Sequence, residues 1–437
     1  MEVSRQLVHI GVGAIALLLR DLTWAQAAAL AAIAIVFNAL MLPRLAPGVF
    51  RRTDRGRRWT SGIVLYPAAV LTLILLLPNR LDLVATAWAI LAVGDGMATL
   101  IGAHVGTSSL PWNREKSVGG LLAFILFGSA AAVGMTWWSA ASTMGGWMFT
   151  APIAAAVLAG FAETAPVHLD DNITVPAIAA TVLWSMSHMT PEVLLAHVTA
   201  PGATTWTLVG LNAVVATAGW AARTVTVAGA VTGAIIGAIM IVGSGVAGWA
   251  MLIATFLAAS LATRVGHARK TRAGIAEDRG GRRGPGNAIA NTGVAAWAAL
   301  IAAGSADATV PHLALVAALA TAGSDTVASE VGKAWGRTTW LVTSLRRVAP
   351  GTTGAVSLEG TVAGILSSAL LAGIGAWAGL VSPSAVPLVV VVASAASLVE
   401  GVIGATLEAR GMLTNDAVNF VNSAMGAGLA MLLWSVL

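Results

Sequence analysis

The stretches Gly94-Asp95-Gly96-Met97-Ala98 and Ser324-Asp325-Thr326-Val327-Ala328 each set one carboxylate inside a long apolar run. A charge at the centre of a bilayer costs at least about 2.5 kcal/mol, so such residues usually face a cavity or a partner. Glycines follow each aspartate by 7 and 11 residues: Gly102 and Gly106 in the first copy, Gly332 and Gly336 in the second. In a helix these positions share one face with the aspartate. The pattern predicts two related polar sites on apolar helices.

The composition excludes a water-soluble protein. Of the 437 residues, 57% are hydrophobic and only 10% are charged, and the mean hydropathy is +0.84. A soluble domain carries about 25% charged residues. Cysteine is absent, which excludes disulfides, thiolate metal sites and cysteine nucleophiles. We therefore expect an all-α polytopic membrane protein.

Uncharged runs of helical length predict about fifteen transmembrane helices. They lie at about 6–20, 23–43, 61–78, 82–104, 117–138, 150–163, 172–188, 206–222, 225–242, 246–264, 288–304, 312–333, 355–380, 385–405 and 417–436. If the N-terminus is inside, every Lys and Arg except Arg20 and Arg80 falls on the cytoplasmic side, as the positive-inside rule requires. We expect an integral protein of a bacterial or archaeal cytoplasmic membrane, with its active sites facing the cytoplasm.

The chain also predicts an internal repeat. Lys116-Ser117-Val118-Gly119-Gly120 opens one apolar run, and Val356-Ser357-Leu358-Glu359-Gly360 opens its counterpart. Two parallel seven-helix units are expected, at 1–190 and 223–437. A unit with an odd number of spans ends on the opposite face, so two units in one orientation need a further crossing. The connector 191–222, with a linker helix at 206–222, supplies it.

Lys116 and Ser117 stand at the predicted cytoplasmic start of a span. A lysine and a serine at a helix N-terminus can cradle a phosphate, although a snorkelling topology anchor is the alternative. The second copy carries Val356 in place of the lysine. There Arg346, Arg347 or a residue of another loop would have to meet the phosphate.

Several carboxylates gather on the same predicted face. With no cysteine and few histidines, such groups suit a hard ion such as Mg²⁺ rather than zinc. The alternative for Asp170 is a helix cap. The expected metal ligands are Asp95, Asp170, Asp171, Asp325 and Asp416.

The loop 264–293 is basic and leads into an apolar run. Its arginines, among them Arg282 and Arg283, can attract anionic lipid head groups or polyphosphate. Asn287 and Asn291, four residues apart at a helix entrance, suggest polar groups that line a site.

These residues carry two family resemblances. The first unit, with Arg5, His9, the Asp95 stretch, Pro111-Trp112 and Lys116-Ser117, resembles the polyprenol kinases, meaning the phytol and dolichol kinase family. It is distantly similar to the CTP:phosphatidate cytidylyltransferases. The second unit resembles the membrane family that includes phytyl-phosphate kinase. That match rests on the 274–291 loop, the Asp325 stretch and the strings within 350–361.

The resemblances imply that a fused pair of kinases phosphorylates an isoprenoid alcohol to its monophosphate and then to the diphosphate, with CTP as donor and Mg²⁺ as cofactor. Catalytic roles are expected for Asp95, Lys116, Glu163, Asp325, Glu359 and Glu400. Nucleotide or phosphate contacts are expected for Gly102, Gly106, Ser117, Arg282, Arg283, Asn287, Asn291, Ser329, Gly332, Gly336 and Ser357. Expected partners are the alcohol, its monophosphate, CTP and the lipid bilayer. No nucleic acid is expected, and a homo-oligomer is compatible with the sequence.

Two other classes of function stay open. A CTP-dependent lipid cytidylyltransferase would use the same nucleotide and metal but release pyrophosphate. A transporter would also explain repeats and intramembrane carboxylates, although transporter sites usually lie near the midplane and their repeats are often inverted. The two units also differ, because the first has Gly119 where the second has Glu359.

Overall fold

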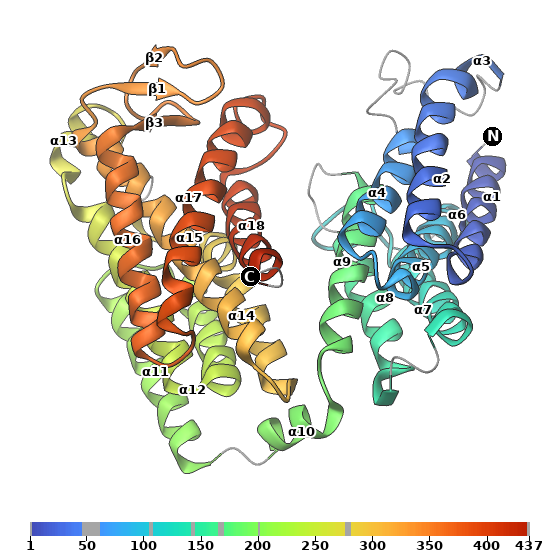
Figure 1. The fold of residues 1–437 in the computed structure, drawn as a ribbon, viewed down its shortest axis with the longest axis horizontal. Helices are drawn as coiled ribbons and strands as arrows, with labels where there is room; N and C mark the ends of the chain where they lie inside the picture. The colour runs from blue at the N-terminus through green and yellow to red at the C-terminus, as the bar shows by residue number, and fades with distance from the viewer. Residues whose placement is uncertain are drawn as a thin grey trace. The chain divides into compact units, whose positions relative to one another are not determined.

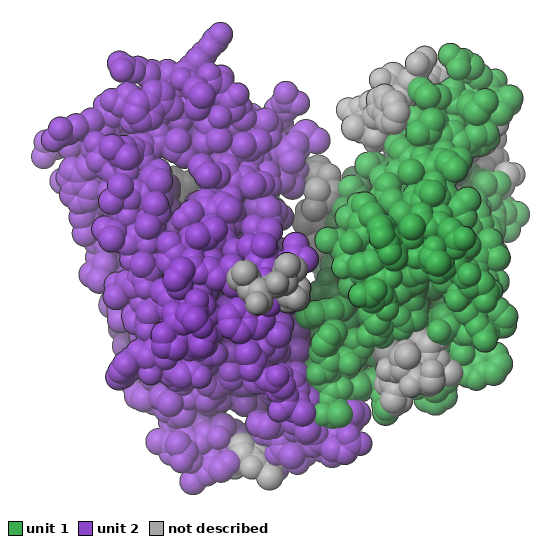
Figure 2. All heavy atoms as spheres, in the orientation of Figure 1, with its two compact units in different colours: residues 1–190 green, residues 191–437 purple. Residues whose placement is uncertain are grey.

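The apolar runs form helices, because in lipid a helix satisfies its own backbone N–H and C=O groups. The computed structural model describes residues 2–45, 62–104, 108–140, 145–164, 170–199, 202–275 and 281–434. Nine helices within these ranges are long and apolar enough to cross a membrane. The protein is therefore an integral membrane protein. Its residues divide into two compact units, 1–190 and 191–437 (Figure 2).

Unit 1 consists of helices of several types. Its α-helices are α1 (Glu2–Gly13), α2 (Trp24–Val36), α3 (Leu42–Leu45), α4 (Gly62–Leu76), α5 (Leu81–Ala89), α6 (Gly96–His104), α7 (Val118–Ala140), α8 (Thr150–Glu163) and α9 (Asp171–Ser187). Short 3₁₀ helices are η1 (Ala14–Arg20) and η6 (Gly145–Trp147), and π-helices are η2 (Phe37–Met41) and η5 (Ile90–Asp95).

Helix α7 is central to the packing of unit 1. The ring of Phe124 is fully buried. A methyl group at Gly94 would lie 3.0 Å from this ring, and one at Gly160 would lie 2.9 Å from it. The two glycines thus let η5 and α8 approach the same side chain. Asp95 follows Gly94 directly, and Glu163 lies one turn beyond Gly160, so this packing brings the two carboxylates together.

Unit 2 contains helices and one small sheet. Its helices are α10 (Pro191–Thr199), α11 (Ala203–Ala221), α12 (Val227–Arg264), α13 (His267–Arg272), α14 (Pro285–Gly304), α15 (Thr309–Trp335), α16 (Leu358–Trp377), α17 (Val386–Ile403) and α18 (Asn415–Trp434), with a 3₁₀ turn η8 (Pro383–Ala385) and a π-helix η9 (Gly404–Glu408). Helix α15 carries the core, because every residue from Leu313 to Ala320 is buried.

The long helix α12 reverses direction at Gly245, where φ is +61° and ψ is −154°. Glycine tolerates this backbone conformation. A methyl group at Gly248 would lie 3.2 Å from the carbonyl oxygen of Met240, whereas eight residues of continuous helix span about 12 Å. Ile236 before the break and Leu252 after it also line one cavity. The two halves therefore form a hairpin, which accounts for the separate predicted spans 225–242 and 246–264.

The structure confirms the prediction of an all-α polytopic membrane protein, and it adds one small sheet. Three short antiparallel strands, β1 (Thr339–Leu341), β2 (Arg347–Val348) and β3 (Ala355–Ser357), form a sheet in the order β2-β1-β3. Thr339 pairs with Val348 on one side and with Ser357 on the other. Hydropathy over helical windows does not register strands of two or three residues. Figure 1 shows the sheet and α13 at the same end of unit 2.

Helix α11, predicted as a linker, packs within unit 2. Its buried Asn212 donates from Nδ2 to the carbonyl of Ala234 at 2.8 Å and accepts from Trp249 Nε1 at 3.0 Å. Both partners belong to α12. The amide of Asn212 thus anchors the predicted linker helix on the α12 hairpin, and the domain bounds 1–190, 191–222 and 223–437 stay a prediction. The count of fifteen spans stays a prediction.

We predict that Gly243→Ala lowers the thermal unfolding midpoint in detergent. The added methyl would lie 2.0 Å from the backbone oxygen of Ala299, and a backbone atom cannot rotate away, so α12 and α14 must separate. Overpacking of this kind costs about 1–3 kcal/mol. The matched control is Gly373→Ala in α16, where nothing lies within 4 Å of the added methyl. Equal midpoints for the two variants would contradict the tight contact.

Candidate active site

Three carboxylates converge in unit 1. Oxygen atoms of Asp95, Glu163 and Asp171 all lie within 4.8 Å of one another. Asp95 ends the π-helix η5, Glu163 ends α8, and Asp171 begins α9. A π-helical segment inside an α-helix is frequently found at a functional site. We call these three residues the unit 1 carboxylate cluster.

Lys116 neutralises part of this cluster. Its Nζ donates to Glu163 Oε1 and, at 3.0 Å, to Asp171 Oδ2. Burial of the side chain disfavours its charge, but the two carboxylates outweigh this effect and raise the pKa of Lys116 above its usual value. Lys116 therefore carries a positive charge at neutral pH, within reach of any phosphate that approaches the cluster.

Helix α1 supports Asp95 from the other side. The Nε2 atom of His9 lies 3.5 Å from Asp95 Oδ2 and 3.4 Å from the carbonyl of Leu91. The His9 ring meets Tyr66 edge-on at 4.7 Å, and the Tyr66 hydroxyl accepts from Trp88 Nε1 at 2.8 Å. This aromatic group fixes the imidazole beside the aspartate.

Ser117 and Gly102 form a close helix contact next to the cluster. The Ser117 hydroxyl accepts from the backbone N–H of Gly120 at 3.1 Å and so caps α7. A methyl group at Gly102 would lie 3.0 Å from that hydroxyl. Gly102 on α6 and Gly120 on α7 therefore let α6 lie against the start of α7. Gly106, the other predicted glycine of this copy, lies outside the described residues.

Asp170 takes the capping role that was the alternative for it. Its Oδ1 accepts from the backbone N–H of Asn172 at 2.9 Å and from Asn172 Nδ2 at 2.7 Å. It lies outside the unit 1 carboxylate cluster. Its neighbour Asp171 is the residue that reaches Lys116.

In unit 2 an open cavity of about 1330 Å³ surrounds Asp325, and we call it the Asp325 cavity. Five predicted site residues line it: Asp325, Ser329, Gly332, Ser357 and Glu400. The side chains of Asp325 and Glu400 interact directly, and Glu408 and Lys333 act on Asp325 through their charges. The cavity thus combines carboxylates with a cation.

The contacts around Ser117 recur here. Ser357 caps α16 by accepting from Gly360 N at 3.1 Å, and a methyl group at Gly332 would lie 3.1 Å from the Ser357 hydroxyl. Thr339, seven residues after Gly332, pairs with Ser357. Ser109, seven residues after Gly102, forms an isolated bridge with Ser117.

The cation of the Asp325 cavity is Lys333, a residue that sequence reasoning missed. Its Nζ donates to Glu330 Oε1 at 2.8 Å, while the fully buried Lys270 donates to Glu330 Oε2 and to the carbonyl of Thr263 at 2.8 Å. Glu330 is therefore held between two lysines. Arg346 and Arg347, which were expected as candidates for this role, are exposed and lie at strand β2.

A glycine-containing loop forms one wall of the Asp325 cavity. Gly351 and Gly354 both have positive φ, at 85° and 76°, and the four residues from Gly351 to Gly354 all line the cavity. A methyl group at Gly354 would lie 2.4 Å from the carbonyl of Gly401, so only glycine permits this approach to α17. Asn415 and Asn419 complete the polar lining from α18.

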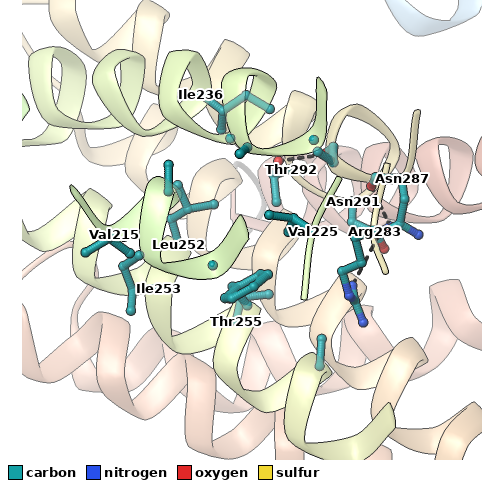
Figure 3. Close-up of a pocket in the computed structure, with 18 of the residues that line it drawn as sticks. Val215, Val225, Ile236, Leu252, Ile253, Thr255, Arg283, Asn287, Asn291 and Thr292 are labelled. Atoms are coloured by element: carbon teal, nitrogen blue, oxygen red, sulfur yellow. Dashed lines mark hydrogen bonds between the residues drawn. The ribbon is translucent and has the colours of Figure 1, made fainter. Parts of the chain in front are cut away.

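The predicted loop residues line a different cavity. Arg283, Asn287 and Asn291 lie at one side of an open cavity of about 860 Å³ that residues of α11, α12, α14 and α15 line (Figure 3). We call it the Arg283 cavity. The unit 2 residues that were predicted to form one site are thus divided between two cavities.

Four predicted residues line neither cavity. Arg282 is exposed, and Gly336 ends α15. Glu359 accepts weakly from the Arg337 backbone at 3.4 Å. Asp416 lies against the start of α14, where a methyl group at Gly286 would be 2.3 Å from Asp416 Oδ2. The sequence could have predicted a site role for Lys333, because Lys333 follows Ser329 by one turn on the helix that carries Asp325.

The unit 1 carboxylate cluster fits a Mg²⁺ ion in the chemistry of its donors. Its three members offer oxygen atoms close enough to bind one ion, and such ligands suit Mg²⁺. Lys116 already contacts two of the three, so a metal would share the carboxylates with this ammonium group. Asp95 and Asp171 are the residues that would hold it, which leaves Glu163 to accept a proton.

Comparisons with known proteins place this chain among membrane proteins. Residues 210–427 match the family model described as integral membrane protein DUF92. An uncharacterized membrane protein of Synechocystis is 42% identical over 200 residues, which are 45% of this chain and 78% of the relative. Protein VTE6, chloroplastic, of Arabidopsis thaliana is 38% identical over 196 residues, covering 43% of this chain and 59% of VTE6.

A third relative is the probable phytol kinase 3, chloroplastic, of Glycine max. It is 29% identical over 200 residues, which are 41% of this chain and 62% of that protein. No solved structure matches the chain. Through residues 210–427, the chain belongs to the integral membrane protein family DUF92.

Proposed function

We propose that the protein is a membrane kinase with two active sites, which phosphorylates an isoprenoid alcohol in unit 1 and the resulting monophosphate in unit 2. A relative named as a probable phytol kinase supports the membrane kinase and its class of substrate. The resemblance of each unit to one kinase family supports the two steps. Recurrence of the Ser117 contacts around Ser357 supports the repeat on which a two-site enzyme depends.

The observation that carries the proposal is the convergence of Asp95, Glu163 and Asp171 around Lys116. Phosphoryl transfer requires mainly that the two reactants are positioned and that the charge on the transferred group is neutralised. The carboxylates of the cluster can hold a metal that positions the nucleotide, and the ammonium group of Lys116 can neutralise charge on the phosphate. A bound Mg²⁺ would neutralise the triphosphate and orient it for in-line attack.

In the first step the alcohol oxygen attacks the terminal phosphorus of the nucleotide. A new P–O bond to the lipid forms, the bond between the terminal phosphorus and its bridging oxygen breaks, and the nucleoside diphosphate leaves. The hydroxyl proton passes to a carboxylate, for which Glu163 is placed at the end of α8. Lys116 stabilises the charge on the transferred phosphoryl group.

In unit 2 the Asp325 cavity is the proposed nucleotide site. Lys333 supplies positive charge, and the Gly351–Gly354 loop offers backbone groups at the wall. Asp325 and Glu400 would hold the metal with the triphosphate. CTP as the donor rests on the family resemblance alone, so the nucleotide has to be varied in the test.

We predict that the purified protein with Mg²⁺ and CTP labelled at its γ-phosphate transfers label to phytol or geranylgeraniol. Asp95→Asn should lower formation of the monophosphate at least about 100-fold, because it removes a member of the unit 1 cluster. Asp325→Asn should let the monophosphate form and accumulate but suppress the diphosphate. The products are separated by thin-layer chromatography, with ATP and UTP as competing donors.

Asp307→Asn is the control for these variants, because Asp307 is exposed and caps Thr309, a role that asparagine also fills. It should keep both activities. Recovery of the label only in pyrophosphate would mean that the protein is a cytidylyltransferase and not a kinase. Absence of turnover with every alcohol and nucleotide would favour a transporter.

Metal binding gives a separate prediction for unit 1. Asp171→Asn is expected to weaken Mn²⁺ binding about 10-fold or more, because it removes an oxygen ligand, whereas Asp170→Asn keeps the helix cap and should bind as before. Electron paramagnetic resonance of free Mn²⁺ measures the affinity, in a chain that also carries Asp325→Asn to silence unit 2. A loss with Asp170→Asn equal to that with Asp171→Asn would contradict the assignment of the cluster.

A further inference from the structure

The Arg283 cavity has two chemically different ends. Figure 3 shows Val215, Leu252 and Ile253 at one end and Arg283 with Asn287 at the other. The apolar part is completed by side chains from α11 and both halves of α12. The cavity is open on one side, and the space of about 860 Å³ within it includes open solvent. Such a cavity suits a molecule with a long apolar body and a small anionic head.

The cationic end is held in place by the backbone. Arg283 N donates to Thr224 O, and Arg283 O accepts from Thr226 N, each at 3.0 Å. A methyl group at Gly229 would lie 2.4 Å from Arg283 O, so α12 begins in contact with this residue. The guanidinium donates to Asn287 Oδ1 at 3.4 Å and to Thr263 Oγ1 at 3.5 Å.

The start of α14 adds further donors at the same end. Its N-cap is Gly284, and no side chain in the described part of the protein caps it. The first-turn N–H groups of a helix attract anions. The Asp416 carboxylate already lies against this turn at Gly286, so the guanidinium of Arg283 is the main attraction for a phosphate at this end. Asn291, one turn beyond Asn287, is buried and donates to Asn287 O at 2.9 Å. Two amides and an arginine thus surround the head of the cavity.

The opposite end is mostly apolar. Asn212 is the polar residue there, and its amide is engaged with Ala234 O and Trp249 Nε1. Both polar atoms of its side chain therefore already have a partner in the protein. The remaining lining at this end is aliphatic or aromatic, including Val215, Ala216 and Phe256.

We propose that the Arg283 cavity is the acceptor site of unit 2 and binds an isoprenyl monophosphate, with its phosphate at Arg283 and Asn287 and its hydrocarbon chain between α11 and the α12 hairpin. This inference rests on the proposed function for its choice of lipid. It separates the acceptor from the nucleotide, which belongs to the Asp325 cavity.

The two cavities lie beside neighbouring positions of α15. Thr326 lines the Arg283 cavity and Ser329 lines the Asp325 cavity. Residues three apart are neighbours on a helix surface. An oxygen of the acceptor phosphate would attack the terminal phosphorus of the nucleotide near these positions. A P–O–P bond forms, the bond between the terminal phosphorus and its bridging oxygen breaks, and the nucleoside diphosphate leaves. An ionised phosphate oxygen has no proton to lose.

The test is equilibrium binding of tritiated geranylgeranyl monophosphate to the full chain in detergent, without nucleotide. Ala216→Phe fills the apolar end, and Arg283→Gln removes the cation. Each is expected to weaken binding about 10-fold or more, since a charged hydrogen bond or a pocket of this size contributes at least that factor. Arg283→Lys, which keeps the charge, should restore most of the affinity.

The controls make the same chemical changes elsewhere in unit 2. Ala213→Phe lies on α11 at an exposed position that does not line the cavity, and Arg410→Gln removes an exposed arginine. Both should bind like the unchanged protein. Thermal midpoints of all variants separate loss of binding from loss of fold.

Undiminished binding by folded Ala216→Phe and Arg283→Gln would overturn the proposal, even if the protein makes the diphosphate. Equal displacement by dioleoyl phosphatidic acid would also overturn it, because the cavity would then accept phospholipids in general. Selective loss in these two variants supports the acceptor site. Selective loss of binding would support the lipid site even if the protein makes no diphosphate from CTP. In that case only the proposed kinase activity would be overturned.

Discussion

A carboxylate in an apolar helix must be balanced by a cation or reach water, and this constraint sets the position of the polar side chains in both units. In unit 1 the balance comes from Lys116, which joins Glu163 to Asp171. In unit 2 Glu330 lies between Lys270 and Lys333. Removing one partner from a buried pair leaves an uncompensated charge, which is strongly destabilising. The lysines that balance these carboxylates come from the loop before α7 in unit 1, and from α13 and α15 in unit 2.

Close helix contacts bring the helices of each site together. A methyl group at Gly120 would lie 3.3 Å from Ala98 O, and one at Gly360 would lie 2.5 Å from Ala328 O. In each unit the helix after the aspartate therefore lies against the first turn of a helix that a serine caps. Small residues permit such approach in membrane proteins. Packing and chemistry share the same residues, so a glycine substitution here would displace the site as well as the helices.

Hydropathy and residue spacing predicted much of this arrangement, because both report local properties. Each apolar run became helical, and the break between 242 and 246 appeared at Gly245, as a glycine at positive φ. Hydropathy did not predict the sheet from Thr339 to Ser357, because its strands are much shorter than the window used to find helices. Lys270 was counted only as a loop charge. Its burial against Glu330 depends on α13 folding back on α15, which no local pattern encodes.

The difference between the two units follows the difference between their proposed acceptors. An alcohol must lose a proton as it attacks, and unit 1 places three carboxylates where one can receive it. A phosphate monoester is already ionised, so unit 2 needs positive charge for the acceptor more than it needs a base. Arg283 lines a cavity whose described lining contains no carboxylate, whereas the Asp325 cavity and the unit 1 cluster both combine carboxylates with a lysine. Unit 1 has Lys116 before its capping serine, and unit 2 has Val356 at the same place. This difference fits a second site whose cations come from α15 and from the loop before α14.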